Sequence, residues 1–478
     1  MQQEGVWIIS TDAFTGLRGL AAVWIMIFHC FQLIETPVDL QGSSLMPLFF
    51  LLSGFSLTLS YRPIQNSRTS IPFFSFYRNR VARAYPVYLL WNLLSIPLWA
   101  FGYGTSPQSS LITSLLISIF LASTALCSVF GENLDLPSWT ISTLVFMWLF
   151  FPFSASRLYN LSDSDLINKI VTCFWIQLIL ILVLYFPLVA LFGESSFVFF
   201  MSTCNPWTRY PVFQMGVYAA ELCVRARDRS MEWPAVPFFF PFSFCAQRNS
   251  GYCSERGSDE EQMLWARSAD AKALFLLLFT LLVAFVDAVY RYASVNHPLL
   301  SSNPSIDGAV WLQAINPLAQ LTLLVALVRD GGQSLASRFL CHPALQWLGR
   351  ISMSIYLIHY PVIDYLLWAN NRGASVKWPS SSSCGSHQAT DADDHCSDEV
   401  KSFKQLRTLP IWLIPVIVVV TIVLAQGTFY FVEEPCREAL RYSAMARQIP
   451  AVSGTAYVEK QHIIAAVDAV DEPESEGV

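Results

Sequence analysis

The stretch LRGLAAVWIMIFHCFQLI, at residues 17–34, holds two basic side chains and no acidic one. An apolar run of this kind has about the length that spans the hydrocarbon core of a bilayer. Arg18 and His29 are eleven residues apart, and eleven helical steps of about 100° come to roughly three full turns. The stretch therefore predicts a transmembrane helix on which both basic side chains share one face, about 16–17 Å apart along the axis.

The composition of the whole chain agrees with a membrane protein. Of the 478 residues, 54% are hydrophobic and 13% are charged, whereas an ordinary soluble domain carries about 25% charged residues. The net charge of −6 and the lack of a pronounced basic stripe argue against nucleic acid as a partner. We expect an all-α polytopic protein whose principal partner is the lipid bilayer.

Apolar segments recur along the sequence. They are residues 17–34, 45–61, 85–102, 111–130, 139–153, 167–192, 208–223, 272–290, 309–328, 351–369 and 409–432. Basic residues concentrate at Arg62–Arg83, Arg225–Lys272, Arg329–Arg350 and Arg437–Arg447. The positive-inside rule puts all four basic stretches in the cytoplasm only if 111–130 or 139–153 does not cross the membrane. We therefore expect a bundle of about ten transmembrane helices around a central cavity, with both termini cytoplasmic. A re-entrant or partly inserted segment near 111–153 would line that cavity.

The polar parts of the chain lie between and after these segments. A bundle domain over 1–440 is expected to carry a cytoplasmic insertion at 224–271 and an outer or luminal loop at 371–408, and the acidic tail at 441–478 is expected to be disordered. The outer loop contains four residues of types that bind zinc, which are Cys384, His387, His395 and Cys396. Their spacing is not that of a standard zinc finger, so no metal is expected.

An ionisable residue at membrane depth is a candidate functional residue. A histidine with a near-neutral pKa can remove a proton from a hydroxyl group, and an arginine at the membrane edge can hold a phosphate. The pair suits a long donor molecule that lies along the helix, with its anionic head at Arg18 and its reactive end at His29. Alternatively, His29 serves packing alone through a hydrogen bond to a neighbouring helix.

The R-x(10)-H spacing within LRGLAAxWxxxxH resembles acyltransferase family 3, the membrane O-acyltransferases. Further motifs resemble that family in its own order, namely PLFFLLSGFSLTLSY (47–61), FYRNRVARAYPVYLL (76–90), PSWTISTLVFMWLFFP (137–152), LGRISMSIYLIHYPV (348–362) and VEEPCR (432–437). The resemblance runs from about residue 12 to residue 440.

The resemblance implies an enzyme that moves an acyl group, expected to be acetyl, from cytoplasmic acyl-CoA to a hydroxyl of a glycan, lipid or small metabolite. It implies that His29 acts as general base and that Arg18 is essential. Arg80 and Arg83, about one helical turn apart, would bind the phosphates of the donor. The alternative for these two arginines is that they only anchor their helix at the cytoplasmic surface.

Three more residues belong to the expected site. Ser53 is a candidate for donor binding, although packing through the adjacent Gly54 is the stronger interpretation. Trp139 would wall the acyl pocket or else belong to an interfacial tryptophan belt. His359 is a candidate for acceptor binding or proton transfer, with an interface-seeking histidine as the alternative.

The chain departs from the family pattern at two positions. Leu144 stands where the family usually has Glu, and Thr15 where it usually has Asp; Asp12, one turn earlier, is a possible substitute. If the missing carboxylate orients the histidine, the proton relay must differ here. The alternatives to an active enzyme are therefore a catalytically altered family member and a transporter of a small molecule.

Overall fold

The computed structural model describes residues 10–34, 38–66, 71, 73–101, 135–192, 196–229, 256–296, 304–374 and 406–445. Within these ranges the chain is helical and has no strand. The longer helices are α1 (Asp12–Gln32), α2 (Met46–Asn66), α3 (Phe73–Leu94), α7 (Trp139–Arg157), α8 (Asp163–Phe192), α10 (Pro206–Arg229), α11 (Arg256–Asn296), α12 (Pro304–Arg329), α15 (Ser352–Asn370) and α17 (Leu413–Thr428). Shorter elements are η1 (Gly42–Leu45), α4 (Ile96–Ala100), η2 (Leu136–Ser138), η3 (Leu158–Asn160), α9 (Ser196–Phe199), η4 (Phe200–Cys204), α13 (Leu335–Leu340), α14 (Pro343–Arg350), η6 (Phe429–Glu433) and α18 (Glu434–Met445).

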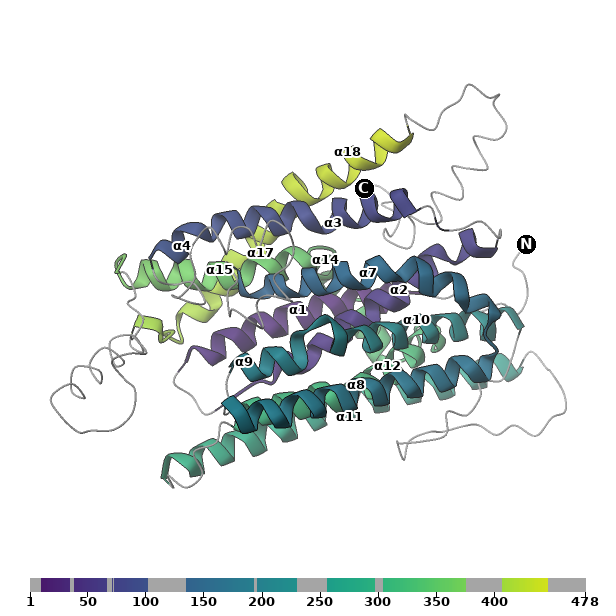
Figure 1. Ribbon diagram of the computed structural model, residues 1–478, viewed down its shortest axis with the longest axis horizontal. Coiled ribbons are helices and arrows are strands. Elements are labelled where there is room, and N and C mark those ends of the chain that lie inside the picture. The colour runs from purple at the N-terminus through teal and green to yellow at the C-terminus, as the bar shows by residue number, and fades with distance from the viewer. Residues whose placement is uncertain are drawn as a thin grey trace.

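The long helices lie roughly side by side along the longest axis of the molecule (Figure 1). One end of the bundle holds the start of α1, the start of α3 and helix α14, and we call it the arginine end because Arg18, Arg80, Arg83 and Arg350 lie there. The other end holds the C-terminal end of α1 with His29, and we call it the histidine end. Both termini of the described chain, in α1 and α18, lie at the arginine end.

Seven of the helices in the described ranges are long and apolar enough to cross a membrane, so the expectation of an all-α membrane protein is confirmed. These helices are α1, α2, α7, α8, α11 and α12, with α17 running on through η6 into α18. Helices α3, α10 and α15 carry more polar side chains but run beside them in the same bundle (Figure 1). The number of ten crossings stays a prediction, because residues 102–134 lie outside the described ranges.

Only the second half of the irregular segment expected near 111–153 lies within the described residues. Its second half, 139–153, belongs to α7, which is a regular helix of membrane-spanning length. Of the two segments left open, 139–153 is therefore helical, and the re-entrant or partly inserted segment near 111–153 stays a prediction. The other half, 111–130, lies outside the described residues.

Glycines bring two pairs of helices into very close contact. A Cβ atom added at Gly54 of α2 would lie 2.2 Å from the carbonyl oxygen of Phe213 in α10, and one at Gly216 would lie 2.2 Å from that of Leu51. The same holds between α1 and α14, where a Cβ atom on Gly349 would lie 2.1 Å from the carbonyl oxygen of Thr15. Small residues at such positions let helix backbones approach in membrane bundles. The packing role expected for Gly54 is confirmed.

Helix α12 lies at the centre of the bundle and α11 at its edge. The apolar window of α12 is 83% buried and that of α11 only 6%. Pro317 within α12 cannot donate to the carbonyl of Gln313, one turn earlier. The side-chain amide of Gln177, from α8, donates to that carbonyl over 3.1 Å. A neighbouring helix thus satisfies the backbone group that the proline leaves free, as a proline in a spanning helix requires.

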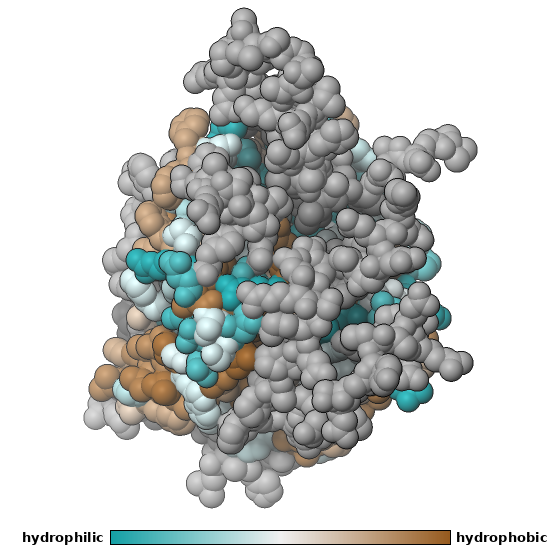
Figure 2. Space-filling model, turned by 90° about the vertical axis from the view of Figure 1, so that its right-hand side faces the viewer, coloured by the Kyte–Doolittle hydropathy of each residue, from teal (hydrophilic) through white to brown (hydrophobic). Residues whose placement is uncertain are grey.

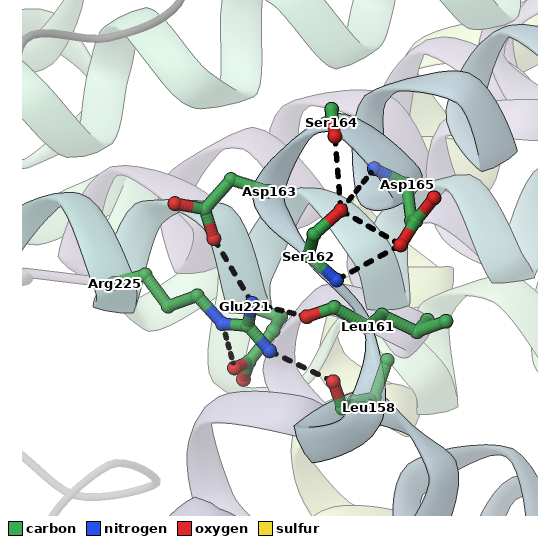
Figure 3. A network of polar contacts seen from close by, with 8 residues as sticks. All are labelled: Leu158, Leu161, Ser162, Asp163, Ser164, Asp165, Glu221 and Arg225. Atoms are coloured by element: carbon green, nitrogen blue, oxygen red, sulfur yellow. Dashed lines mark hydrogen bonds and ion pairs between the residues drawn. The ribbon is translucent and has the colours of Figure 1, made fainter.

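A buried arginine joins α8 and α10 near the arginine end (Figure 3). Arg225 donates to Glu221 over 2.7 Å and to Asp163 over 2.9 Å, and it also donates to the carbonyl oxygens of Leu158 and Leu161, each over 2.7 Å. The guanidinium group therefore satisfies the exposed carbonyls where α7 ends and ties them to the start of α8. A cation that donates four such hydrogen bonds fixes the turn between the two helices.

The polar insertions differ in part from their expected bounds. Helix α10 continues to Arg229 and α11 already begins at Arg256, so both ends of the 224–271 insertion are helical. Helix α18 continues to Met445, into the segment expected as a disordered tail. Most of the outer loop and the rest of the tail lie outside the described residues, and so do the four candidate zinc ligands. Figure 2, a view onto the arginine end, shows hydrophilic residues across the middle of that face and hydrophobic residues gathered mainly at its lower left.

Candidate active site

A pocket of about 160 Å³ lies inside the bundle toward the arginine end. Helices α1, α2, α3, α7 and α15 enclose it, together with the last residue of α14 and of η6. Its volume is close to that of an engineered cavity of about 150 Å³ that binds benzene. The pocket therefore accommodates a group of that size, such as a phosphate or a short acyl thioester.

Four guanidinium groups line this pocket. They belong to Arg18, Arg80, Arg83 and Arg350. Arg18 donates to the Thr15 hydroxyl over 3.4 Å, and the guanidinium carbon of Arg80 lies 6.0 Å from the centre of the Phe76 ring. Arginine forks bind phosphate and carboxylate groups strongly because each presents several charged donors in one plane. The arrangement suits an anionic ligand.

One carboxylate faces the four arginines. Glu433 closes the π-helical turn η6, is buried, and accepts a hydrogen bond from the Ser354 hydroxyl over 3.0 Å. Arg83 and Arg18 lie within electrostatic range of it. Single π-turns within helices occur frequently at functional sites. Among the residues that line the pocket, the arginines outnumber this carboxylate, so the pocket carries positive charge.

Both departures from the family pattern lie at the pocket. Leu144 and Thr15 line it directly. Asp12, the possible substitute, accepts a hydrogen bond from the Ser10 hydroxyl over 3.0 Å and is not among the residues that line the pocket. Among the lining residues Glu433 is the acidic one, so no carboxylate at Leu144 or Thr15 reduces the positive charge.

His29 and Arg18 both lie on the side of α1 that faces α15. Arg18 shares the pocket with Ser352 and Tyr356 of α15. His29 stacks on His359 of the same helix, with ring centres 5.2 Å apart, and its Nδ1 is 2.9 Å from the Gln32 amide oxygen. The two basic side chains of α1 are therefore aligned along one partner helix.

The histidine pair lies beyond the end of the pocket rather than in its wall. Tyr356 lies between the pocket and the histidine pair, since it lines the pocket and its ring centre is 5.8 Å from that of His359. His359 is fully buried within the bundle, and His29 is half-buried toward the histidine end. A ligand that extends past Tyr356 would reach the two imidazole rings.

Of the other predicted residues, Ser53 lies in the wall of the pocket and Trp139 lies behind it. Ser53 lines it directly, next to the glycine contact between α2 and α10. Trp139 is buried and does not line the pocket, but its ring packs against Phe50, which does, with centres 6.2 Å apart. Because its side chain is inside the bundle, it does not face lipid.

Three polar residues of the pocket were not among the site residues expected from the sequence. Arg350 and Tyr356 both lie in the quoted LGRISMSIYLIHYPV motif, and Glu433 lies in VEEPCR. The sequence places these motifs far from residue 18, so only folding shows that they share one cavity. The available signal was the charge of Arg350 just before the apolar segment 351–369 and of Glu433 just after the segment 409–432.

A comparison with protein families gives one match. A family model described as an acyltransferase domain matches residues 11–430, nearly the whole chain. No curated protein and no solved structure matches. Every residue that lines the pocket, except Glu433, falls within the matched range.

Proposed function

The chain belongs to the acyltransferase family whose model covers residues 11–430, and on that premise we propose that it is a membrane O-acyltransferase using acyl-CoA. The observation that carries the proposal is the pocket with four arginines and one carboxylate at one end of α1 and the stacked histidines at the other. Coenzyme A is a phosphate-rich anion with a thiol at its far end, which matches this separation of charge and base. Acetyl-CoA is the expected donor, because the family resemblance implies an acetyl group.

The arginines hold the donor and the histidines serve the acceptor. Arg80 and Arg83 bind the phosphates, and Arg18 holds the donor along α1. The acceptor oxygen attacks the thioester carbonyl carbon while His29 takes the hydroxyl proton. The carbon–sulfur bond then breaks, and the leaving thiolate receives that proton, so an ester and free coenzyme A result. Orientation and proton removal supply the rate, and no acyl-enzyme is required.

The proposed orientation places the arginine end in the cytoplasm. The described parts of the four basic stretches lie toward that end, which agrees with the positive-inside rule. Cytoplasmic acyl-CoA then reaches the pocket directly, while the acceptor arrives at the histidine end from the membrane or the outer side.

The test measures release of free coenzyme A from acetyl-CoA by the full chain in lipid nanodiscs. We expect His29→Asn to lower turnover by at least about 100-fold, the usual contribution of general base catalysis. His342→Asn is the matched control, since His342 lies at the start of α14 and only caps that helix. Unchanged turnover in His29→Asn would exclude the base assignment.

A catalytically silent member of the family is the second candidate, and Leu144 and Thr15 favour it. Both line the pocket where the family usually has a carboxylate. This candidate predicts no turnover for any hydroxyl acceptor, and a lack of coenzyme A binding in calorimetry at millimolar concentration would favour it. A transporter predicts flux of a small molecule without coenzyme A.

A further inference from the structure

Arg350 lies at the mouth of the pocket, outside the other three arginines. It is the last residue of α14 and is exposed, whereas Arg18, Arg80 and Arg83 are half-buried. From Arg350 the wall of the pocket continues along α15 to Tyr356, which is 8% exposed and lies at the inner end. The pocket therefore carries one outer cation, three cations at middle depth and a tyrosine at its inner end.

Close packing fixes the backbone on both sides of Arg350. A Cβ atom added at Gly19 of α1 would lie 2.6 Å from the backbone nitrogen of Gly349, so α1 and α14 are in direct backbone contact there. Ile351, on the other side, is 1% exposed. The exposed side chain of Arg350 thus extends from a fixed position beside the turns of α1 that carry Arg18. A ligand that binds this guanidinium orders one side chain and no backbone, which keeps the entropic cost of binding small.

The charge of Arg350 is not offset within the described part of the chain. No ion pair among the described residues involves it. Glu433, the acidic residue among those that line the pocket, lies within electrostatic range of Arg83, Arg437 and Arg18 instead. Anchoring of α14 at the membrane surface would not by itself require this side chain to line a cavity. A guanidinium group without an ion-pair partner on a pocket wall indicates an anionic ligand, and phosphate fits its planar donors.

The order of the cations matches the order of the phosphates in an acyl-CoA donor. Coenzyme A carries a pyrophosphate between its pantetheine arm and its adenosine, and a third phosphate on the 3′ oxygen of the ribose, at the end remote from the thiol. With the thioester toward Tyr356 and the histidine pair, the pyrophosphate comes next and the 3′-phosphate lies outermost. The three half-buried arginines then meet the pyrophosphate, and the exposed Arg350 meets the 3′-phosphate.

We propose that Arg350 binds the 3′-phosphate of the donor and makes this protein select coenzyme A thioesters over donors that lack this phosphate. This rests on the acyl-CoA-dependent function proposed above. No bond to Arg350 is made or broken in the reaction. Because the 3′-phosphate is remote from the thioester, the contact is the same in the ground state and in the transition state. Such a contact lowers KM and leaves kcat unchanged.

The test compares coenzyme A with 3′-dephospho-coenzyme A in calorimetry, with the full chain in nanodiscs at low ionic strength, because salt screens an exposed charge. We expect the natural chain to bind coenzyme A at least about tenfold more tightly, since a hydrogen bond between charged groups has an effect of that size. Arg350→Gln should reduce this preference to about threefold or less, because only the more distant arginines then attract the 3′-phosphate. The Kd of 3′-dephospho-coenzyme A should stay the same. In release of free coenzyme A from acetyl-CoA, the variant should show a raised KM and an unchanged kcat.

Arg338→Gln is the matched control, because Arg338 is an exposed arginine of α13 at the same end and does not line the pocket. It should keep the preference of the natural chain. The proposal is overturned if the natural chain binds both nucleotides equally well, or if Arg350→Gln retains the tenfold preference. A fall in kcat without a change in KM would overturn it as well. A natural chain that binds neither nucleotide would instead refute the acyl-CoA-dependent function itself.

Discussion

Arg80 and Arg83 offer a direct test of donor binding at the residue scale. Both guanidinium groups line the pocket, one helical turn apart on α3. A hydrogen bond to a charged group contributes about 1.5–3 kcal/mol, and about 1.4 kcal/mol corresponds to a tenfold change in affinity. We therefore expect Arg80→Gln and Arg83→Gln each to raise the Kd of coenzyme A about 10- to 100-fold in calorimetry. Arg157→Gln, an exposed change at the end of α7, is the control. Equal Kd values in all three would contradict phosphate binding by this pair.

The candidate site could be predicted in part from single residues. Charge within apolar runs singled out Arg18 and His29, because an ionisable group is costly in a bilayer and has few reasons to be there. Helical periodicity then put both on one face. The contact between His29 and His359 could not be predicted, since it depends on how α1 and α15 are rotated against each other.

At the element scale, Gly54 and Gly427 form a matched pair of helix glycines. A methyl group at Gly54 would collide with the backbone of α10, whereas nothing lies within 4 Å of one at Gly427 in α17. Overpacking of a well-packed contact costs about 1–3 kcal/mol, and alanine is favoured over glycine in a helix by about 1 kcal/mol. Gly54→Ala should lower the thermal unfolding midpoint in nanodiscs, and Gly427→Ala should leave it equal or raise it. A lower midpoint only for Gly427→Ala would refute the close contact between α2 and α10.

The network around Arg225 predicts a second effect on stability. Replacing Arg225 by Gln leaves the Asp163 and Glu221 carboxylates and two backbone carbonyls without their shared donor. Loss of one partner from a buried ion pair costs about 3–5 kcal/mol. The variant should unfold at a clearly lower temperature than the natural chain, while the Kd of coenzyme A stays the same, because Arg225 does not line the pocket. A large change in Kd without a change in unfolding would show that this arginine serves the ligand instead.

Hydropathy predicted the apolar spans but not the residues at which several helices begin and end. The spans were predictable because a window of about 20 apolar residues suffices to place a helix in a bilayer. The ends of α10 and α11 were not, since Arg256–Gln262 and the residues near Arg229 are charged and carry no apolar periodicity. Helix α7 was predicted over 139–153 and extends to Arg157, past Pro152, because a proline in a membrane helix need not end it.

The whole molecule makes a prediction about its orientation in the membrane. Cys341 lies between α13 and α14 at the arginine end and is exposed, while Ala374 is exposed just after α15 at the histidine end. In a background in which the other cysteines are alanine, a membrane-impermeant maleimide should label Cys341 only from the cytoplasmic side. A chain with Cys341→Ser and Ala374→Cys should be labelled only from the other side. Burial, and then Asp12 and Asp330, raise the pKa of the Cys341 thiol, so less thiolate is present at pH 7 than for a free thiol. Its labelling rate should therefore be slow at pH 7 and rise about tenfold per pH unit as long as the pH stays below that pKa. Labelling of both sites from the same side would contradict the membrane crossing of α15, and labelling in the reverse sense would place the arginine pocket away from cytoplasmic acyl-CoA.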